Sequence, residues 1–170
     1  TTHRQLGPTE LAKAGLSVNN VLTASRGVLQ LAAAGQLSNA KAAEITAGAL
    51  NMFSMEGERA TEVADLLAAA ANRTMGNVTD MADALRMSGS VASMAGLELD
   101  ELVTAIGMMA QSGLRGSDAG TSIKQMLLSL QAPTEKAASL MRELGINVYD
   151  AQGAMLPMPD IIRQFSAQLG

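Results

Sequence analysis

The fold of this chain is decided by residues 98–131, which read ELDELVTAIGMMAQSGLRGSDAGTSIKQMLLSLQ. Apolar residues in the first part recur at the three- and four-residue spacing of one helix face, at Leu99, Leu102, Val103, Ile106 and Met109. The pattern breaks at Gly113 and Gly116 and then resumes. Glycine often ends a helix because it adopts the left-handed backbone conformation without steric cost. The stretch therefore predicts two helices joined by a short turn.

The same periodicity extends outward over nearly all of the 170 residues, with glycine-containing breaks about every fifteen to twenty residues. It predicts an all-α fold, a compact multi-helix bundle of about eight or nine short helices. We expect Leu102, Ile106 and Leu127 to lie in its core. The breaks place the helices at 9–14, 17–34, 38–53, 57–73, 77–95, 98–112, 117–131, 134–144 and 159–169.

Hydroxyl and amide side chains stand at several of the expected helix starts. Ser17, Ser38 and Ser117 each precede a helical pattern, where a side-chain oxygen can accept a hydrogen bond from an unpaired backbone N–H. Asn77 and Asp80 have the spacing of a capping box. Helix capping therefore accounts for these residues, and the serines need no catalytic role.

The segment near the C-terminal end departs from the helical pattern. Two short apolar stretches flank the turn sequence Asp-Ala-Gln-Gly at 150–153, which predicts a small β-hairpin at 146–156. An isolated ribbon is marginal in water, so this hairpin must pack against other parts of the chain, through Ile146 and Val148. The hairpin and the final helix together occupy 145–169.

Two parts of the chain echo each other in sequence. An offset of about 60 residues aligns apolar positions in pairs: Ile45 with Ile106, Ala49 with Ala110, Val63 with Ile123 and Leu67 with Leu127. Two explanations stay open, a pseudo-repeat of residues 17–73 and 77–131, or chance matches among alanine-rich helices. A duplication would give a pseudo-symmetric bundle, because an open solenoid normally needs at least three repeats.

Composition excludes several classes of protein. Hydrophobic residues make up 48% of the chain and charged residues 16%, which excludes intrinsic disorder. The net charge is −4 and no run of Lys or Arg occurs, so we expect no specific nucleic-acid binding. The sequence starts at Thr1 without a methionine and stops at Gly170 directly after a helical pattern. We therefore expect residues 1–170 to be a single helical domain excised from a longer chain.

Acidic clusters are the strongest candidates for catalytic chemistry, since paired carboxylates serve acid–base catalysis. The chain has two such clusters, Glu56 with Glu58 and Glu62, and Glu98 with Asp100 and Glu101. Both lie at expected helix starts, where the helix dipole favours negative charge. His3 is the one histidine and cysteine is absent, which leaves no thiolate nucleophile and no histidine- or thiolate-based metal site. We therefore predict a non-enzymatic chain with no catalytic, cofactor-binding or metal-binding residues and no cofactor.

The twelve methionines are spread over nearly every expected helix. Methionine fills irregular gaps in a core, and it also suits surfaces that repack against partners or lipid. A membrane-active helical protein and a generic helical protein-interaction domain have this same composition. Both therefore stay open as alternative functions.

Residues 88–165 carry short motifs in a specific order. They are SGSVASMAGLELDEL at 88–102, QSGLRGSDAGTSIK at 111–124, LQAP at 130–133, LGI at 144–146 and YDAQG at 149–153. An earlier set comprises ALNMF at 49–53, ADLL at 64–67 and AAN at 70–72. These motifs resemble the core region of phage tail tape measure proteins, and the resemblance covers roughly residues 25–168.

The resemblance implies a phage or prophage protein that lies in the lumen of the tail tube, sets tail length during assembly and leaves ahead of the DNA. It implies partners among the tail tube, tail-tip or baseplate and tail assembly chaperone proteins, together with self-association of the full-length chain and contact with the host membrane during ejection. The implied locations are the virion and, during assembly, the bacterial host cytoplasm. The family is recognised by fold-forming positions, so it assigns no functional residue.

Overall fold

A computed structural model describes residues 18–169 of the chain. Eight α-helices and one short 3₁₀ helix cover most of this part, which confirms the all-α fold. They are α2 (Val18–Gly35), α3 (Asn39–Met52), η1 (Gly57–Arg59), α4 (Ala60–Arg73), α5 (Val78–Met94), α6 (Leu99–Gln111), α7 (Gly116–Gln131), α8 (Glu135–Glu143) and α9 (Met158–Leu169). The helix expected at 9–14, and the residues His3 and Ser17, lie outside the described residues.

Two of the expected capping sites are confirmed. The Ser38 hydroxyl accepts a hydrogen bond from the Lys41 backbone N–H at 3.2 Å. At the start of α5, Asn77 and Asp80 form the reciprocal capping box, with backbone N–H to side-chain oxygen distances of 2.8 and 3.1 Å. Each pair satisfies backbone donors that the first helical turn leaves unpaired.

Two expected helix starts are wrong. The helix expected at 57–73 is divided into η1 and α4. Helix α7 begins at Gly116, so Arg115 occupies the N-cap position and Ser117 lies inside the first turn. The cause is Gly116, which is buried and turns the chain directly into the helix with a φ of +59°. Side chains with a Cβ rarely adopt that conformation.

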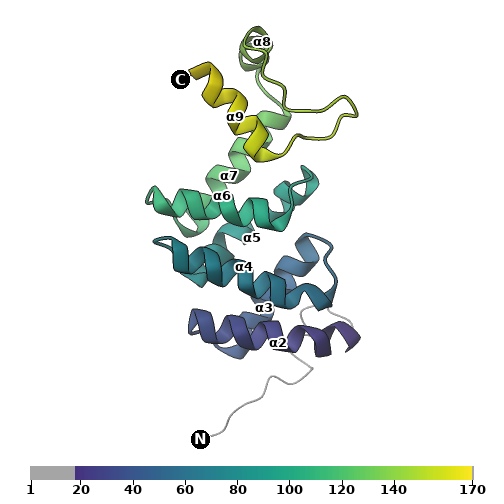
Figure 1. Cartoon of the computed structure of the whole chain (residues 1–170), viewed down its shortest axis with the longest axis vertical. Helices are drawn as coiled ribbons and strands as arrows, with labels where there is room; N and C mark the ends of the chain where they lie inside the picture. The colour runs from purple at the N-terminus through teal and green to yellow at the C-terminus, as the bar shows by residue number, and fades with distance from the viewer. Residues whose placement is uncertain (1–17, 170) are drawn as a thin grey trace, which may run out of the picture.

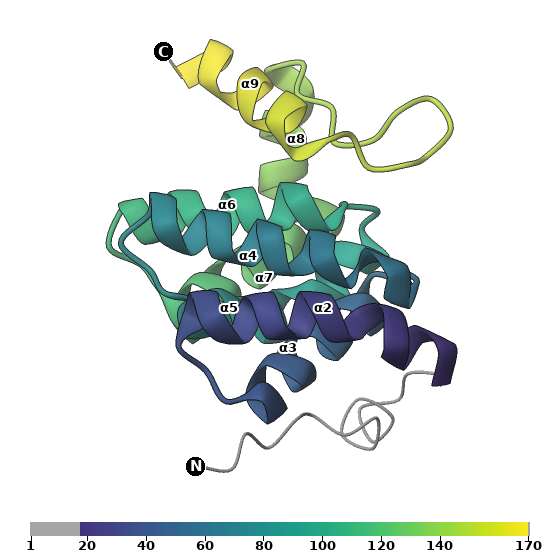
Figure 2. The ribbon, with the colours of Figure 1, turned by 60° about the horizontal axis from the view of Figure 1, so that its bottom comes forward.

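Successive helices alternate between two rows (Figure 2). One row contains α2, α4 and α6, the other contains α3, α5 and α7, and helices two apart in sequence pack side by side. The rows rise along the long axis of the molecule from α2 towards α8 and α9 (Figure 1). The most extensive contacts join α2 to α4 and α5 to α7.

Glycine permits both of these close contacts. A Cβ atom at Gly27 of α2 would collide with the backbone of Ala60, at the start of α4. A Cβ atom at Gly120 of α7 would likewise collide with the backbone of Ala84 in α5. The helix axes can therefore approach closely only because these two positions lack side chains.

The core between the rows is built from alanine and medium-sized apolar side chains. Leu102, Ile106 and Leu127 are each at most 1% exposed, as predicted. Two polar side chains are also buried. Ser88 donates a hydrogen bond from its hydroxyl to the Ala84 carbonyl at 2.8 Å, whereas the Thr46 hydroxyl is buried without a hydrogen-bond partner among the described residues.

Several helices end with a residue in the left-handed conformation. Gly96, Gly113 and Gly145 have φ values of 84°, 88° and 68°, in agreement with the glycine-containing breaks. At the first break the left-handed residue is Gln36, with a φ of 51°, and not the preceding Gly35. At the end of α3 it is Ser54, with a φ of 50°. The same turn therefore forms with and without glycine.

The expected hairpin at 146–156 is present only as a minimal ribbon. One isolated antiparallel bridge pairs Tyr149 with Met155, and no β-sheet forms within the described residues. The Asp150 carboxylate closes the turn by accepting hydrogen bonds from the backbone N–H groups of Gln152 and Ala154 at 2.9 and 2.8 Å. The pairing ends at Val148 and Leu156, directly before Pro157, which has no N–H to donate. The Gln164 side chain of α9 bonds both backbone groups of Asn147, at 2.7 and 3.0 Å.

Ile146 and Val148 are each 5% exposed, as expected for the residues that anchor the ribbon. From α9, Ile161 and Met158 are buried as well, at 1% and 4% exposure, and Met158 joins the main core. Helix α8 has no fully buried residue. The segment after α7 is therefore held by a few side chains rather than by an extensive helix interface.

Candidate functional site

The first acidic cluster serves the start of α4. Glu62 accepts two hydrogen bonds from the Arg59 guanidinium, at 2.7 Å from Nε and 2.6 Å from Nη2. These bonds lower the pKa of Glu62 below its ordinary value and raise that of Arg59. Both side chains are about half exposed, so solvent screens the pair. Glu56 is the residue that precedes η1, and Glu58 lies within it.

The second acidic cluster serves the start of α6. The Glu101 carboxylate accepts a hydrogen bond from the Glu98 backbone N–H at 3.1 Å, and Asp100 accepts one from the Glu101 N–H at 2.9 Å. Across the residues that the structure describes, no group of three or more His, Asp or Glu side chains could hold a metal ion. Both clusters thus have a local structural role, as their positions in the sequence suggested.

The surface has several shallow hollows, and those beside α6 are mainly apolar. One of about 440 Å³ lies between the end of α5 and the ribbon, and no charged side chain lines it. A second, of about 240 Å³, lies between α4 and α6, and a third, of about 160 Å³, lies between α6 and α9. The last two are smaller than the roughly 300 Å³ at which small-molecule sites usually begin. Neither has the form of a ligand pocket.

These last two hollows lie next to each other along α6. Thr104 and Met108 line both of them. The Met108 side chain is 57% exposed, and Ile162, which lines the hollow between α6 and α9, is 44% exposed. We call this surface the α6 strip, and it comprises Leu66, Ala70, Val103, Thr104, Gly107, Met108, Met158 and Ile162.

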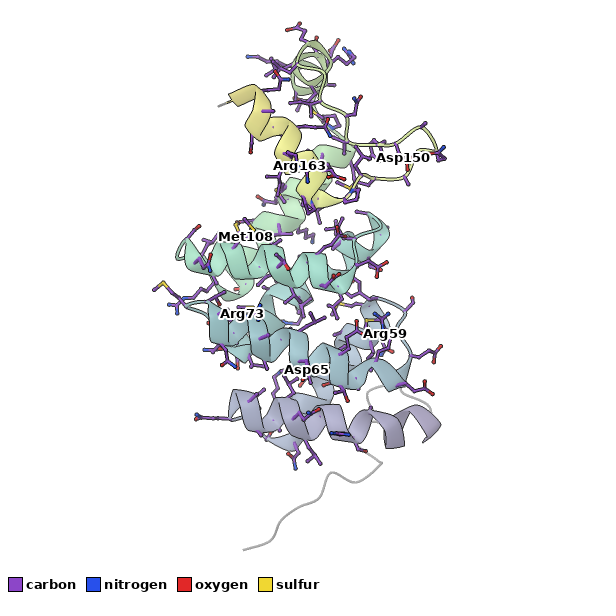
Figure 3. The ribbon with its side chains drawn as sticks, viewed as in Figure 1. Arg59, Asp65, Arg73, Met108, Asp150 and Arg163 are labelled. Carbon is purple, nitrogen blue, oxygen red and sulfur yellow. The ribbon has the colours of Figure 1, made fainter. Side chains whose placement is uncertain are left out.

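The α6 strip has opposite charges at its two ends. Arg73 lines the end between α4 and α6, beside Gln111, and Figure 3 shows Arg73 and Met108 on the same side of the stack. Asp100 and Glu101 line the other end, next to α9. Within residues 18–169, no ion pair joins Arg73, Asp100 or Glu101 to another side chain. The strip is therefore apolar along its length and polarised from end to end.

Sequence reasoning did not identify this strip. Met108 belongs to the same helical pattern as the buried Ile106, and half the strip comes from α4 and α9, distant in sequence. The methionines divide between the two uses that the sequence left open. Met81 and Met158 are buried, whereas Met75, Met94, Met108 and Met126 are between 40% and 87% exposed.

No described helix combines the length and apolar character required to cross a lipid bilayer. The acidic clusters act at helix starts, and the surface features are apolar strips and shallow hollows. Such an arrangement defines the class of all-α helical stacks, a fold that does not by itself specify a function.

Comparison with known proteins identifies the family within this class. The model of the phage-related minor tail protein family matches residues 6–170, and the chain belongs to that family. The chain is 40% identical over 158 residues to the tape measure protein of Pneumococcus phage Dp-1, covering 93% of this chain and 14% of that protein. It is 30% identical over 157 residues to the probable tape measure protein of Escherichia phage P2, covering 92% of this chain and 19% of that protein. No solved structure matches.

Proposed function

We propose that this chain is part of a phage or prophage tail tape measure protein and acts, without catalysis, in tail assembly, tail-length determination and genome delivery. The observation that carries the proposal is the 40% identity to a tape measure protein across nearly the whole chain. The helical stack supports it, because its acidic clusters make local hydrogen bonds at helix starts and the hollow beside the ribbon has no charged side chain in its lining.

The proposal includes where the protein acts and what it contacts. As part of a tape measure protein, the chain would lie in the tail lumen of the virion, after assembly in the cytoplasm of the bacterial host. Its partners would be the tail tube, tail-tip or baseplate and tail assembly chaperone proteins, with host membrane contact during ejection. The chain spans only 14% and 19% of the two relatives, so we propose that it is one domain of a longer polypeptide.

Within such a polypeptide, this segment would not itself provide the length of the ruler. A continuous helix of 170 residues would reach about 255 Å at 1.5 Å per residue. The described helices fold back on one another between α2 and α7, so the segment spans far less than that length. We propose that helical stretches elsewhere in the polypeptide set tail length, and that this domain contributes to assembly or delivery.

Two deletions in the phage that encodes the chain test this function. One removes residues 78–131, which comprise α5 to α7, and the other removes an equal number of residues from a helical stretch outside residues 1–170. Tail length is measured by electron microscopy and infectivity by plaque counts. We expect the first deletion to abolish tails or infectivity, and the second to shorten tails by about 1.5 Å per residue removed.

Viable phage with proportionally shorter tails after removal of 78–131 would contradict the assigned role of this domain. Normal tails and infectivity after both deletions would contradict the tape measure function altogether. Leakage of dye-filled liposomes on addition of the isolated chain, without any tail defect in the deletion phage, would instead favour the membrane-active alternative.

A further inference from the structure

The α6 strip exposes apolar side chains next to two shallow hollows. It places the exposed side chains of Met108 and Ile162 beside two apolar hollows, on the face where α4, α6 and α9 adjoin. Contacts between α4 and α6 are far less extensive than those between α2 and α4, which leaves the hollow between α4 and α6 open. Contiguous exposed apolar surface of this kind marks an interaction site in many proteins.

The charges at the two ends of the strip specify what would fit it. Arg73 marks one end, beside Gln111 at the end of α6, and Asp100 with Glu101 marks the other, at the start of α6. Asp100 and Gln111 are about 16 Å apart along the helix axis at a rise of 1.5 Å per residue. Arg59 acts electrostatically on Asp100, but its guanidinium is already bound by Glu62. A partner must therefore offer negative charge at one end, positive charge at the other, and an apolar centre.

The strip itself has this pattern when it is turned by 180°. We propose that the α6 strip is a self-complementary docking surface for a second copy of this chain, with a twofold axis beside Thr104 and Met108. The axis would bring Arg73 of each copy opposite Asp100 and Glu101 of the other, because an isologous interface repeats every contact twice. Each Met108 would enter a hollow of the facing strip, where a flexible thioether adapts to the available space.

The strip is small, so the dimer would be weak and reversible. Specific interfaces usually bury more than about 1,000 Å² in total, and weaker transient ones bury less. This pairing involves only the described face of α4, α6 and α9. It does not depend on the proposed tail function, and failure of either leaves the other standing.

Sedimentation equilibrium of the 170-residue chain at about 0.1–1 mM measures the association directly. We expect a monomer–dimer equilibrium. Met108→Glu should raise the dissociation constant by about tenfold or more, because it places a charge at the centre of the interface. Met94→Glu is the matched control, since Met94 is 87% exposed and lies outside the strip. Circular dichroism establishes that each variant is folded.

A charge-exchange experiment tests the twofold geometry. Arg73→Glu alone and Asp100→Arg alone should each weaken dimerisation by about tenfold, because each creates two like-charge contacts. An equimolar mixture of the two variants should restore association to within about threefold of the unmodified chain, since each exchanged charge in the mixed dimer again faces an opposite charge. Arg26→Glu, on α2 and away from the strip, is the control for a change in net charge.

The absence of cysteine allows a further measurement on the same samples. Thr104→Cys should form an intermolecular disulfide under mild oxidation, because the proposed axis passes beside it, whereas Met94→Cys should not. A chain that stays monomeric at 1 mM, a dimer unaffected by Met108→Glu, or single charge variants whose mixture does not reassociate would each overturn the proposal.

Discussion

The helices α2 to α4 and the helices α5 to α7 have a similar pattern of contacts, in which the first and third helices of each set form the most extensive interface. Gln36 and Gly96, sixty positions apart, both hold the left-handed turn that ends the first helix of each set. Each set also has a close contact between its first and third helices, but the glycine that permits it lies on a different helix in each set. Gly27 on the first helix faces Ala60 on the third, whereas in the second set Gly120 on the third helix faces Ala84 and Met87 on the first.

This difference shows what the architecture requires. Two helix backbones can approach closely when either one lacks a side chain at the contact, so the requirement belongs to the pair rather than to one position. We propose that the two sets are a pseudo-repeat, residues 17–73 and 77–131, that kept the crossing while its glycine moved. Leu37 and Leu97 occupy equivalent places after the turn, because the backbone N–H of each donates to the carbonyl five residues earlier.

The largest effect is expected from substitutions at matching core positions of the two helix sets. Leu67 and Leu127 lie at matching positions of α4 and α7, and both side chains are fully buried. We expect Leu67→Ala and Leu127→Ala each to lower the free energy of unfolding by about 2–5 kcal/mol, because each leaves a cavity. Urea denaturation measures both values. A large loss from only one of them would show that the two sets are packed differently.

The next largest effect is expected at the two close helix contacts, at Gly27 and Gly120. Gly27→Ala and Gly120→Ala should each destabilise the chain by about 1–3 kcal/mol, because the added Cβ meets backbone that cannot move without shifting a helix. Thermal unfolding followed by circular dichroism measures the loss.

Gly48→Ala is the matched control for both crossing variants. It lies within α3, and a Cβ there meets no atom within 4 Å. The higher helix propensity of alanine should then stabilise the chain by about 0.5–1 kcal/mol. Equal destabilisation by all three substitutions would refute the role assigned to the crossings.

A smaller effect exchanges the turn residues between the two sets. Gln36 holds a φ of 51° where its counterpart Gly96 holds 84°. Gln36→Gly should raise the free energy of unfolding by about 0.5–1 kcal/mol, and Gly96→Ala should lower it by about 1 kcal/mol, because only glycine adopts this region without steric cost. Opposite signs in denaturant titrations are the expected outcome, and effects of the same sign would contradict the equivalence of the two turns.

The smallest effect concerns Glu62, whose pair with Arg59 belongs to the first set. Its pKa is lowered in the folded chain, so the pair contributes stability above the ordinary carboxyl pKa and loses it as pH falls through the lowered value. Glu62→Gln should therefore be slightly less stable than the unmodified chain at pH 7, and the difference should vanish at about pH 2. A difference that persists in acid would point to a role other than this ion pair.

Much of the fold could be predicted from the sequence because its signals are local. The helical spacing of apolar residues located the helices within a few residues, and the capping sequences at Ser38 and at Asn77 with Asp80 form as expected. The same reasoning overestimated the hairpin at 146–156, which forms only one bridge. The ribbon ends directly before Pro157, which has no N–H to donate, and Gln164, distant in sequence, bonds both backbone groups of Asn147.

The sequence by itself determined the all-α fold, the burial of Leu102, Ile106 and Leu127, and the position of the acidic clusters at helix starts. These depend on periodicity and on groups a few residues apart, which any stretch of chain displays. The tertiary structure decided the two rows of helices, the partners of Gly27 and Gly120, and the α6 strip with its opposed charges. Each of these joins residues far apart in sequence, and only packing the helices fixes which of their faces meet and which remain exposed.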